Sequence, residues 1–245
     1  MRLPSTDELV EARRGLAVLA ALAFVLAVFL PMWAIDVHAV QYPDQVLHLH
    51  IYAYPHISGD YVEMHRLNKY IGFYYPDPVY WQPNYPVHEH AVKVPEWSVG
   101  PVAFLAVAAL SVFVAIAPTG EKLRRGLRWQ LVGTIAVFVV MLVDIQYRLY
   151  QTGHSLDPDA PVMGVEGFTP PIWGKYAVAN ITSYSHLDFG AYLSMLAIAL
   201  LVLAYHFRTT DATIREVPGL LSEEVGRVRD DPSRLLDGTR REPRE

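Results

Sequence analysis

Five side chains that can ligate a soft metal ion lie within one short stretch of this sequence. They are His48, His50, His56, Met64 and His65. Imidazole nitrogens bind copper and zinc, and a thioether favours Cu(I). His48 and His50 are two residues apart, so on a strand both rings fall on one face and can chelate one ion. The stretch therefore predicts a metal site, with copper as the expected ion.

The remaining residues of the stretch complete this hypothesis. His56 follows a proline at a bend that can return it towards the histidine pair, and Met64 or His65 would add a further ligand. Tyr52 and Tyr54 would then orient the imidazoles from outside the ligand set. The alternative is structural: the rings hydrogen-bond to nearby tyrosines and hold an irregular outer domain on its supporting helices.

The same stretch predicts a strand followed by a short helix. Apolar residues alternate with His48, His50 and the two tyrosines, which predicts a strand over 46–54. Asp60 and Glu63 have the spacing of a capping box, which predicts a helix over 60–71. We expect the strand and the helix to pack on each other through four apolar side chains: Leu49, Ile51, Leu67 and Ile71.

Apolar runs of membrane-spanning length dominate the rest of the chain. The sequence is 52% hydrophobic with a mean hydropathy of +0.19, and a bilayer core requires about 20 apolar residues per helix. The runs that meet this requirement are 15–34, 99–117, 129–147 and 188–206. The predicted fold is therefore mainly α: a four-transmembrane-helix integral membrane protein with a small irregular α/β extracytoplasmic domain between helices 1 and 2.

The distribution of basic residues predicts the orientation in the cell membrane. Lys and Arg concentrate in the leader 1–14, the loop 118–128 and the tail 207–245. Cytoplasmic segments carry such an excess, so both termini are expected in the cytoplasm. The outer segments 35–98 and 148–187 are then extracytoplasmic, in the periplasm of a cell with two membranes. The first run also resembles the apolar region of a signal peptide, but its length favours an uncleaved anchor.

A second group of polar residues lies near the outer ends of the predicted spans. It comprises Asp144, Arg148, His154, His186 and Asp188. Carboxylates at this depth are costly and are usually paired or functional. One interpretation places Asp144, His154 and His186 at the metal site of a membrane enzyme. The simpler interpretation pairs Asp144 with Arg148 four residues later and makes Asp188 a helix cap.

The absence of cysteine limits the chemistry of the chain. It excludes disulfides, thiolate zinc sites and copper centres built on cysteine. The sequence also contains no phosphate-binding loop, nucleophile elbow or zinc-protease helix, so we predict no catalytic residues. A non-enzymatic role is favoured.

The helix motif resembles a family of four-span membrane proteins, the NosB-like proteins, whose genes accompany clade II nitrous oxide reductases. Lys69 stands where the family pattern has histidine. The resemblance implies a setting in denitrification, beside a copper enzyme that reduces nitrous oxide. The residues that match the pattern are Gly59, Asp60, Glu63, Leu67, Asn68, Tyr70, Ile71 and Gly72.

Three functions remain open at this point. The first is a membrane accessory protein for an extracytoplasmic copper enzyme, acting in assembly, metal supply or electron delivery. The second is an integral subunit of a membrane-bound copper monooxygenase or respiratory complex. The third is a docking scaffold without metal. All three place the chain in the lipid bilayer beside a periplasmic or membrane copper enzyme, and none involves nucleic acid.

Overall fold

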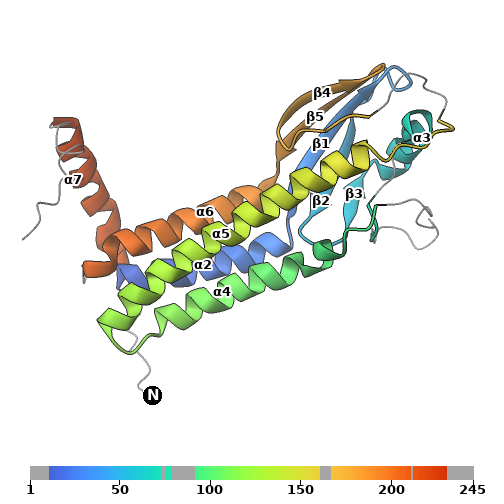
Figure 1. Ribbon diagram of the computed structural model, residues 1–245. Helices are drawn as coiled ribbons and strands as arrows, with labels where there is room; N and C mark the ends of the chain where they lie inside the picture. Colours follow the sequence, from blue (N-terminus) through green and yellow to red (C-terminus); the bar gives the residue numbers. More distant parts are fainter. Residues whose placement is uncertain (1–10, 73–75, 79–91, 161–166, 211, 231–245) are drawn as a thin grey trace, which may run out of the picture.

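The computed structural model describes residues 11–72, 76–78, 92–160, 167–210 and 212–230. Long helices form a bundle, and an antiparallel sheet stands at one end of it (Figure 1). The start of the first helix, the turn between α4 and α5 and the helix α7 lie at the opposite end. The helices of the bundle and of that end are α2 (Ala12–Val28), α4 (Gly100–Ala115), α5 (Gly120–Gly153), α6 (Phe189–His206) and α7 (Val217–Asp230), with short 3-10 turns η1 (Pro95–Val99), η2 (Phe207–Thr209) and η3 (Ile214–Glu216).

Three helical segments in the described part of the chain are long and apolar enough to cross a membrane. They are Pro95–Ala115, Gly120–Gly153 and Phe189–Thr209. They overlap the predicted spans 99–117, 129–147 and 188–206. The α5 helix has 34 residues and is therefore about 51 Å long, well beyond a bilayer core of about 30 Å. Its last turns consequently reach the level of the sheet (Figure 1).

The first predicted span, 15–34, is wrong in its second part. The α2 helix ends at Val28, and the strand β1 begins at Pro31. Proline lacks the backbone N–H that would continue the helix, and it disfavours helical geometry at the residue before it. With 17 residues, about 26 Å, α2 is short for a bilayer span. A fourth span is therefore not established by this structure.

The α2 helix is nevertheless the centre of the bundle. It packs against both α4 and α6, and alanines on its packed face are almost fully buried, which lets the backbones approach closely. Phe24 is also buried and contacts the rings of Phe104 on α4 and Phe138 on α5. The opposite side of α2 exposes three leucines, as a helix in contact with lipid would: Leu19, Leu22 and Leu26.

The sheet has five antiparallel strands in the order β3-β2-β1-β5-β4. Because β1 follows α2 directly and β5 leads into α6, the centre of the sheet is continuous with the bundle. Two of the five strands come from the segment between α5 and α6, so the predicted outer domain, confined to 35–98, was incomplete. The strands are β1 (Pro31–Ala39), β2 (Leu47–Tyr52), β3 (Ile57–Gly59), β4 (Gly174–Val178) and β5 (Ile181–Leu187).

The predicted strand and helix of the histidine stretch are confirmed as β2 and α3 (Tyr61–Ile71). The predicted packing is confirmed only in part. Leu67 and Ile71 pack in a cluster with Leu47, whereas Leu49 and Ile51 belong to a second cluster with Tyr61. The α3 helix thus covers the apolar face of the sheet, and the opposite face carries the histidines.

Candidate functional site: the histidine face of the outer sheet

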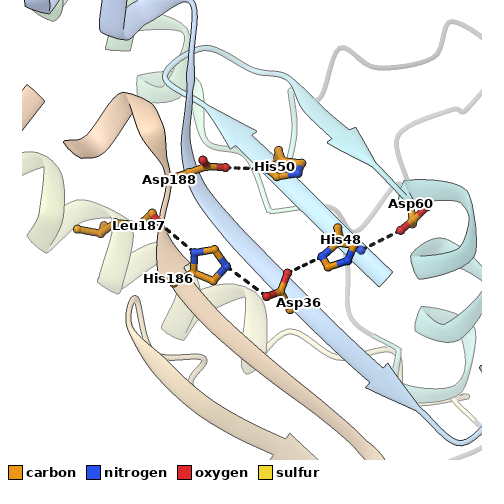
Figure 2. A network of polar contacts seen from close by, with 7 residues as sticks. All are labelled: Asp36, His48, His50, Asp60, His186, Leu187 and Asp188. Carbon is orange, nitrogen blue, oxygen red and sulfur yellow. Dashed lines mark hydrogen bonds and ion pairs between the residues drawn. The ribbon is translucent and has the colours of Figure 1, made fainter. Parts of the chain in front are cut away.

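One face of the sheet gathers imidazoles and carboxylates from three adjacent elements. Asp36 on β1 lies opposite His48 on β2, and Ala34 lies opposite both His50 on β2 and His186 on β5. Side chains alternate across a strand, so these residues share one face. We call this surface the histidine face and define it by five residues: Asp36, His48, His50, His186 and Asp188 (Figure 2).

Asp36 bridges two histidines from the neighbouring strands. Nδ1 of His48 lies 2.7 Å from Asp36 Oδ1, and Nε2 of His186 lies 3.3 Å from Asp36 Oδ2. The other ring nitrogen of His186 lies 3.1 Å from the carbonyl oxygen of Leu187. An ionised carboxylate only accepts hydrogen bonds, so His48 donates through Nδ1–H. One carboxylate therefore fixes the orientation of two rings across three strands.

His50 is held by a different carboxylate. Its Nδ1 lies 2.6 Å from Asp188 Oδ2, and Asp188 Oδ1 accepts a hydrogen bond of 2.7 Å from the backbone N–H of Phe189. The predicted capping role of Asp188 is thereby confirmed, because this contact caps α6. The Asp188 backbone N–H also bonds to the carbonyl of Met32 at 3.0 Å. His50 is thus tied to the junction between the sheet and the helix bundle.

Asp60 fixes the backbone beneath His48. Its carboxylate accepts a hydrogen bond of 2.9 Å from the His48 N–H, and its own N–H donates to the His48 carbonyl at 2.8 Å. The residue before it, Gly59, has φ +98 and lies against the same carbonyl. This is the left-handed region that glycine adopts without steric cost. The tight turn into α3 thereby supports the position of His48.

The five predicted metal ligands do not gather at one place. Met64 packs with Leu49 and Leu67 on the apolar side of the sheet, away from His48 and His50. His65 belongs to the same helix, and His56 contacts the rings of Tyr52 and Tyr54 at 4.9 and 5.7 Å. The described residues contain no group of three or more histidine or carboxylate side chains placed to hold a metal ion. The motif His88-x-His90 lies outside the described residues.

The residues of the alternative enzyme site are also separated. His154 stacks on Tyr150 with ring centroids 4.1 Å apart, while His186 contacts Asp36. Asp144 and Arg148 form the predicted pair at 4.0 Å. Arg148 makes its closest contact with Glu96 of η1, a partner that the sequence did not indicate.

Asp36 is the residue of the site that the sequence analysis missed. It lies at the start of the predicted outer segment 35–98, directly after the predicted first span 15–34. The alternation of Trp33, Ile35 and Val37 with Ala34 and Asp36 is a strand signal. The preceding apolar run concealed it, because Met32, Trp33 and Ala34 also suit a membrane helix.

Comparison with known protein families, with curated proteins and with solved structures finds no match to this chain. The fold itself supports a membrane protein, because three apolar helices can span a bilayer. A small antiparallel sheet stands at one end of these helices, and its exposed face carries the histidine and carboxylate pairs (Figures 1 and 2).

Proposed function

We propose that this protein is a membrane accessory protein that presents the histidine face to an extracytoplasmic copper enzyme. The observation that carries the proposal is the pairing of half-exposed imidazoles with carboxylates on a sheet fixed to the bundle. The His48 side chain is 54% exposed and that of His50 is 41% exposed, while Asp188 is only 8% exposed. The rings are accessible, but their orientation is set from within the fold.

The charge distribution supports an outer location of the histidine face. The start of α2, the first turns of α5 and the end of α6 with its turn η2 lie at the end of the bundle opposite the sheet (Figure 1). These elements carry Arg14, Lys122, Arg125 and Arg208. Cytoplasmic ends of membrane proteins carry such an excess of basic residues. Both termini are then cytoplasmic, and the sheet stands in the periplasm.

The resemblance to the NosB-like proteins supplies the setting, which is nitrous oxide respiration. The residues that carry it form the turn at Gly59 and the helix α3, on the opposite side of the sheet from the histidine face. The motif thus coincides with the element that supports β2. This arrangement favours an accessory function for the reductase, in its assembly, its metal supply or electron delivery to it.

The test is made in cells that respire nitrous oxide and carry this protein. We expect deletion of the gene, and the double substitution His48→Ala/His50→Ala, to lower both nitrous oxide reduction and the copper content of the reductase. His154→Ala is the matched control, because this imidazole directly follows α5 and contacts Tyr150, which is not part of the histidine face. Full reductase activity after deletion would contradict the accessory role. If deletion lowers reductase activity but the double substitution does not, the accessory role belongs to another surface of the protein.

A further inference from the structure

The α5 helix exposes large apolar side chains over only part of its length. Trp129 and Tyr147 are 67% and 57% exposed, and they are 18 residues apart, about 27 Å along a helix. Arg128 precedes this stretch and Arg148 follows it, while the one charged residue within it, Asp144, pairs with Arg148. The large exposed side chains between the two rings are aliphatic, namely Val132, Ile135, Val139, Val140, Leu142, Val143 and Ile145.

The α6 helix shows an apolar band of similar height. Phe189 at its start is 74% exposed, and near its end the guanidinium of Arg208 lies 4.1 Å from the ring centroid of Tyr205. Phe189 and Tyr205 are 16 residues apart, about 24 Å along the helix. The sequence between them contains no charged residue, and Leu196 in this stretch is 52% exposed. On both helices the band therefore ends, away from the sheet, at an aromatic ring beside an arginine.

The short helix α2 has the same height. Arg13 is its second residue, and Phe29 caps its end 16 residues later, about 24 Å away. Phe29 is 68% exposed, and Leu22, seven residues before it, is 55% exposed. The length of α2, which is short for an average bilayer, thus matches the band on α6.

Lipid accounts for these bands better than a protein partner does. The helices α2 and α5 each pack against both α4 and α6, so their exposed faces point to opposite sides of the bundle. A partner would cover one side, whereas acyl chains contact every side at the same height. Aromatic rings settle at the membrane–water interface, and arginines favour the cytoplasmic surface. A hydrocarbon core somewhat thinner than the average of about 30 Å costs little.

We propose that phospholipid surrounds the bundle as a band about 25 Å thick, with its border nearest the sheet at Phe29, Tyr147 and Phe189. This inference goes beyond the proposed function, because it concerns the lipid and not the copper enzyme. Asp188 directly precedes Phe189 and holds His50, so this edge of the histidine face lies at the level of the phospholipid headgroups. An enzyme that contacts His50 must therefore reach the membrane surface.

The experiment measures the depth of nitroxide labels on single cysteines, with the full-length protein in phosphatidylcholine vesicles. The chain has no cysteine of its own. Leu22, Val140 and Leu196 are each seven residues from the border, on α2, α5 and α6, and each is more than half exposed. The labels of Leu22→Cys, Val140→Cys and Leu196→Cys should therefore share one depth, about 10 Å inside the border.

Collision with two relaxing agents gives this depth. Oxygen concentrates in the hydrocarbon, whereas a water-soluble nickel chelate stays outside it. The three labels should relax with oxygen and not with nickel, and Phe189→Cys should respond to both agents. The control is Tyr184→Cys, because Tyr184 is 44% exposed and lies opposite Asp36 in the sheet. Its label should respond mainly to nickel.

Three results would overturn the inference. A label at Leu22 that responds to nickel would place α2 outside the lipid. A label at Phe189 as deep as the one at Val140 would move the border into the sheet. A label at Val140 that responds to neither agent would show that protein covers α5. None of these results involves the reductase, so the accessory role stands or falls separately, by the deletion experiment.

Discussion

The two ends of the helix bundle both carry charged pairs, but the pairs differ in what they leave available. At the end opposite the sheet, Arg14 has a side chain only 6% exposed. Its guanidinium donates to the carbonyl oxygens of Ala115 and Ala117 at 2.6 and 2.9 Å and contacts Glu11 at 3.2 Å. These carbonyls end α4, where a cation is favoured by the helix dipole.

At the end that carries the sheet, His48 and His50 are about half exposed, and each uses one ring nitrogen to contact the fold. The second nitrogen faces away from its carboxylate. Arg14 therefore joins α2 to α4 from within the bundle. The pairs on the sheet instead orient imidazole rings that stay about half exposed.

The largest expected effect is a difference in thiol labelling between the two ends of the molecule, because the proposed orientation places the membrane between them. The chain has no cysteine, so a single introduced cysteine is its only thiol. Ser58→Cys on β3 should react with a membrane-impermeant maleimide added to intact cells, and Ser222→Cys on α7 should react only after lysis. Equal labelling of both in intact cells would contradict the assigned orientation.

Removal of Arg14 should cause the largest loss of stability. Arg14→Met leaves the carbonyls of Ala115 and Ala117 without their donor, and an unsatisfied buried polar group costs about 1–3 kcal/mol. We expect the free energy of unfolding in detergent to fall by about 3 kcal/mol. Arg125→Met is the matched control and should cost about 1 kcal/mol or less, because Arg125 and its partner Glu121 have side chains 73% and 75% exposed. Equal losses in both variants would show that the α4 cap is unimportant.

Substitution of Gly59 should selectively affect the end of the molecule that carries the sheet. A Cβ atom at this position would lie 2.1 Å from the carbonyl oxygen of His48, and φ is +98. Gly59→Ala should therefore cost about 2 kcal/mol and displace the His48 backbone. Hydrogen exchange should increase in β2 and β3. Gly133→Ala on α5 is the control: its Cβ meets no atom within 4 Å, and alanine favours a helix by up to about 1 kcal/mol. Wild-type exchange rates in Gly59→Ala would refute the proposed role of the turn.

The smallest expected effect is the pH dependence of the ion pairs that Glu11 forms with Arg13 and Arg14 at the end opposite the sheet. Burial alone would raise the pKa of Glu11, but hydrogen bonds and charges from Arg13 and Arg14 outweigh it and hold this pKa below its ordinary value of 4.5. The stabilisation is therefore complete above the unfolded-state pKa and is lost as pH falls through the folded-state pKa. The difference in unfolding free energy between wild type and Glu11→Gln, measured from neutral to acid pH, should shrink only below that ordinary value. A difference that is constant with pH would exclude ionisation of Glu11 as its cause.

The features that the sequence determined are those with a local cause. Three apolar runs became helices that can span a membrane, because run length alone sets that property. The strand β2 and the helix α3 were predicted from the alternation of apolar residues and from the spacing of Asp60 and Glu63. The cap at Asp188 and the pair Asp144–Arg148 depend on neighbours at most four residues away.

The partners of the histidines were decided by the tertiary structure. His50 and Asp188 are 138 residues apart in sequence, and Asp36 and His186 are 150 apart. These contacts exist because β1 pairs with both β2 and β5, a choice that no local pattern encodes. The same pairing decided which face α3 covers, and so placed the partly buried Met64 away from the imidazoles. Residue spacing determined that two histidines share a face, whereas strand order determined which carboxylates orient them.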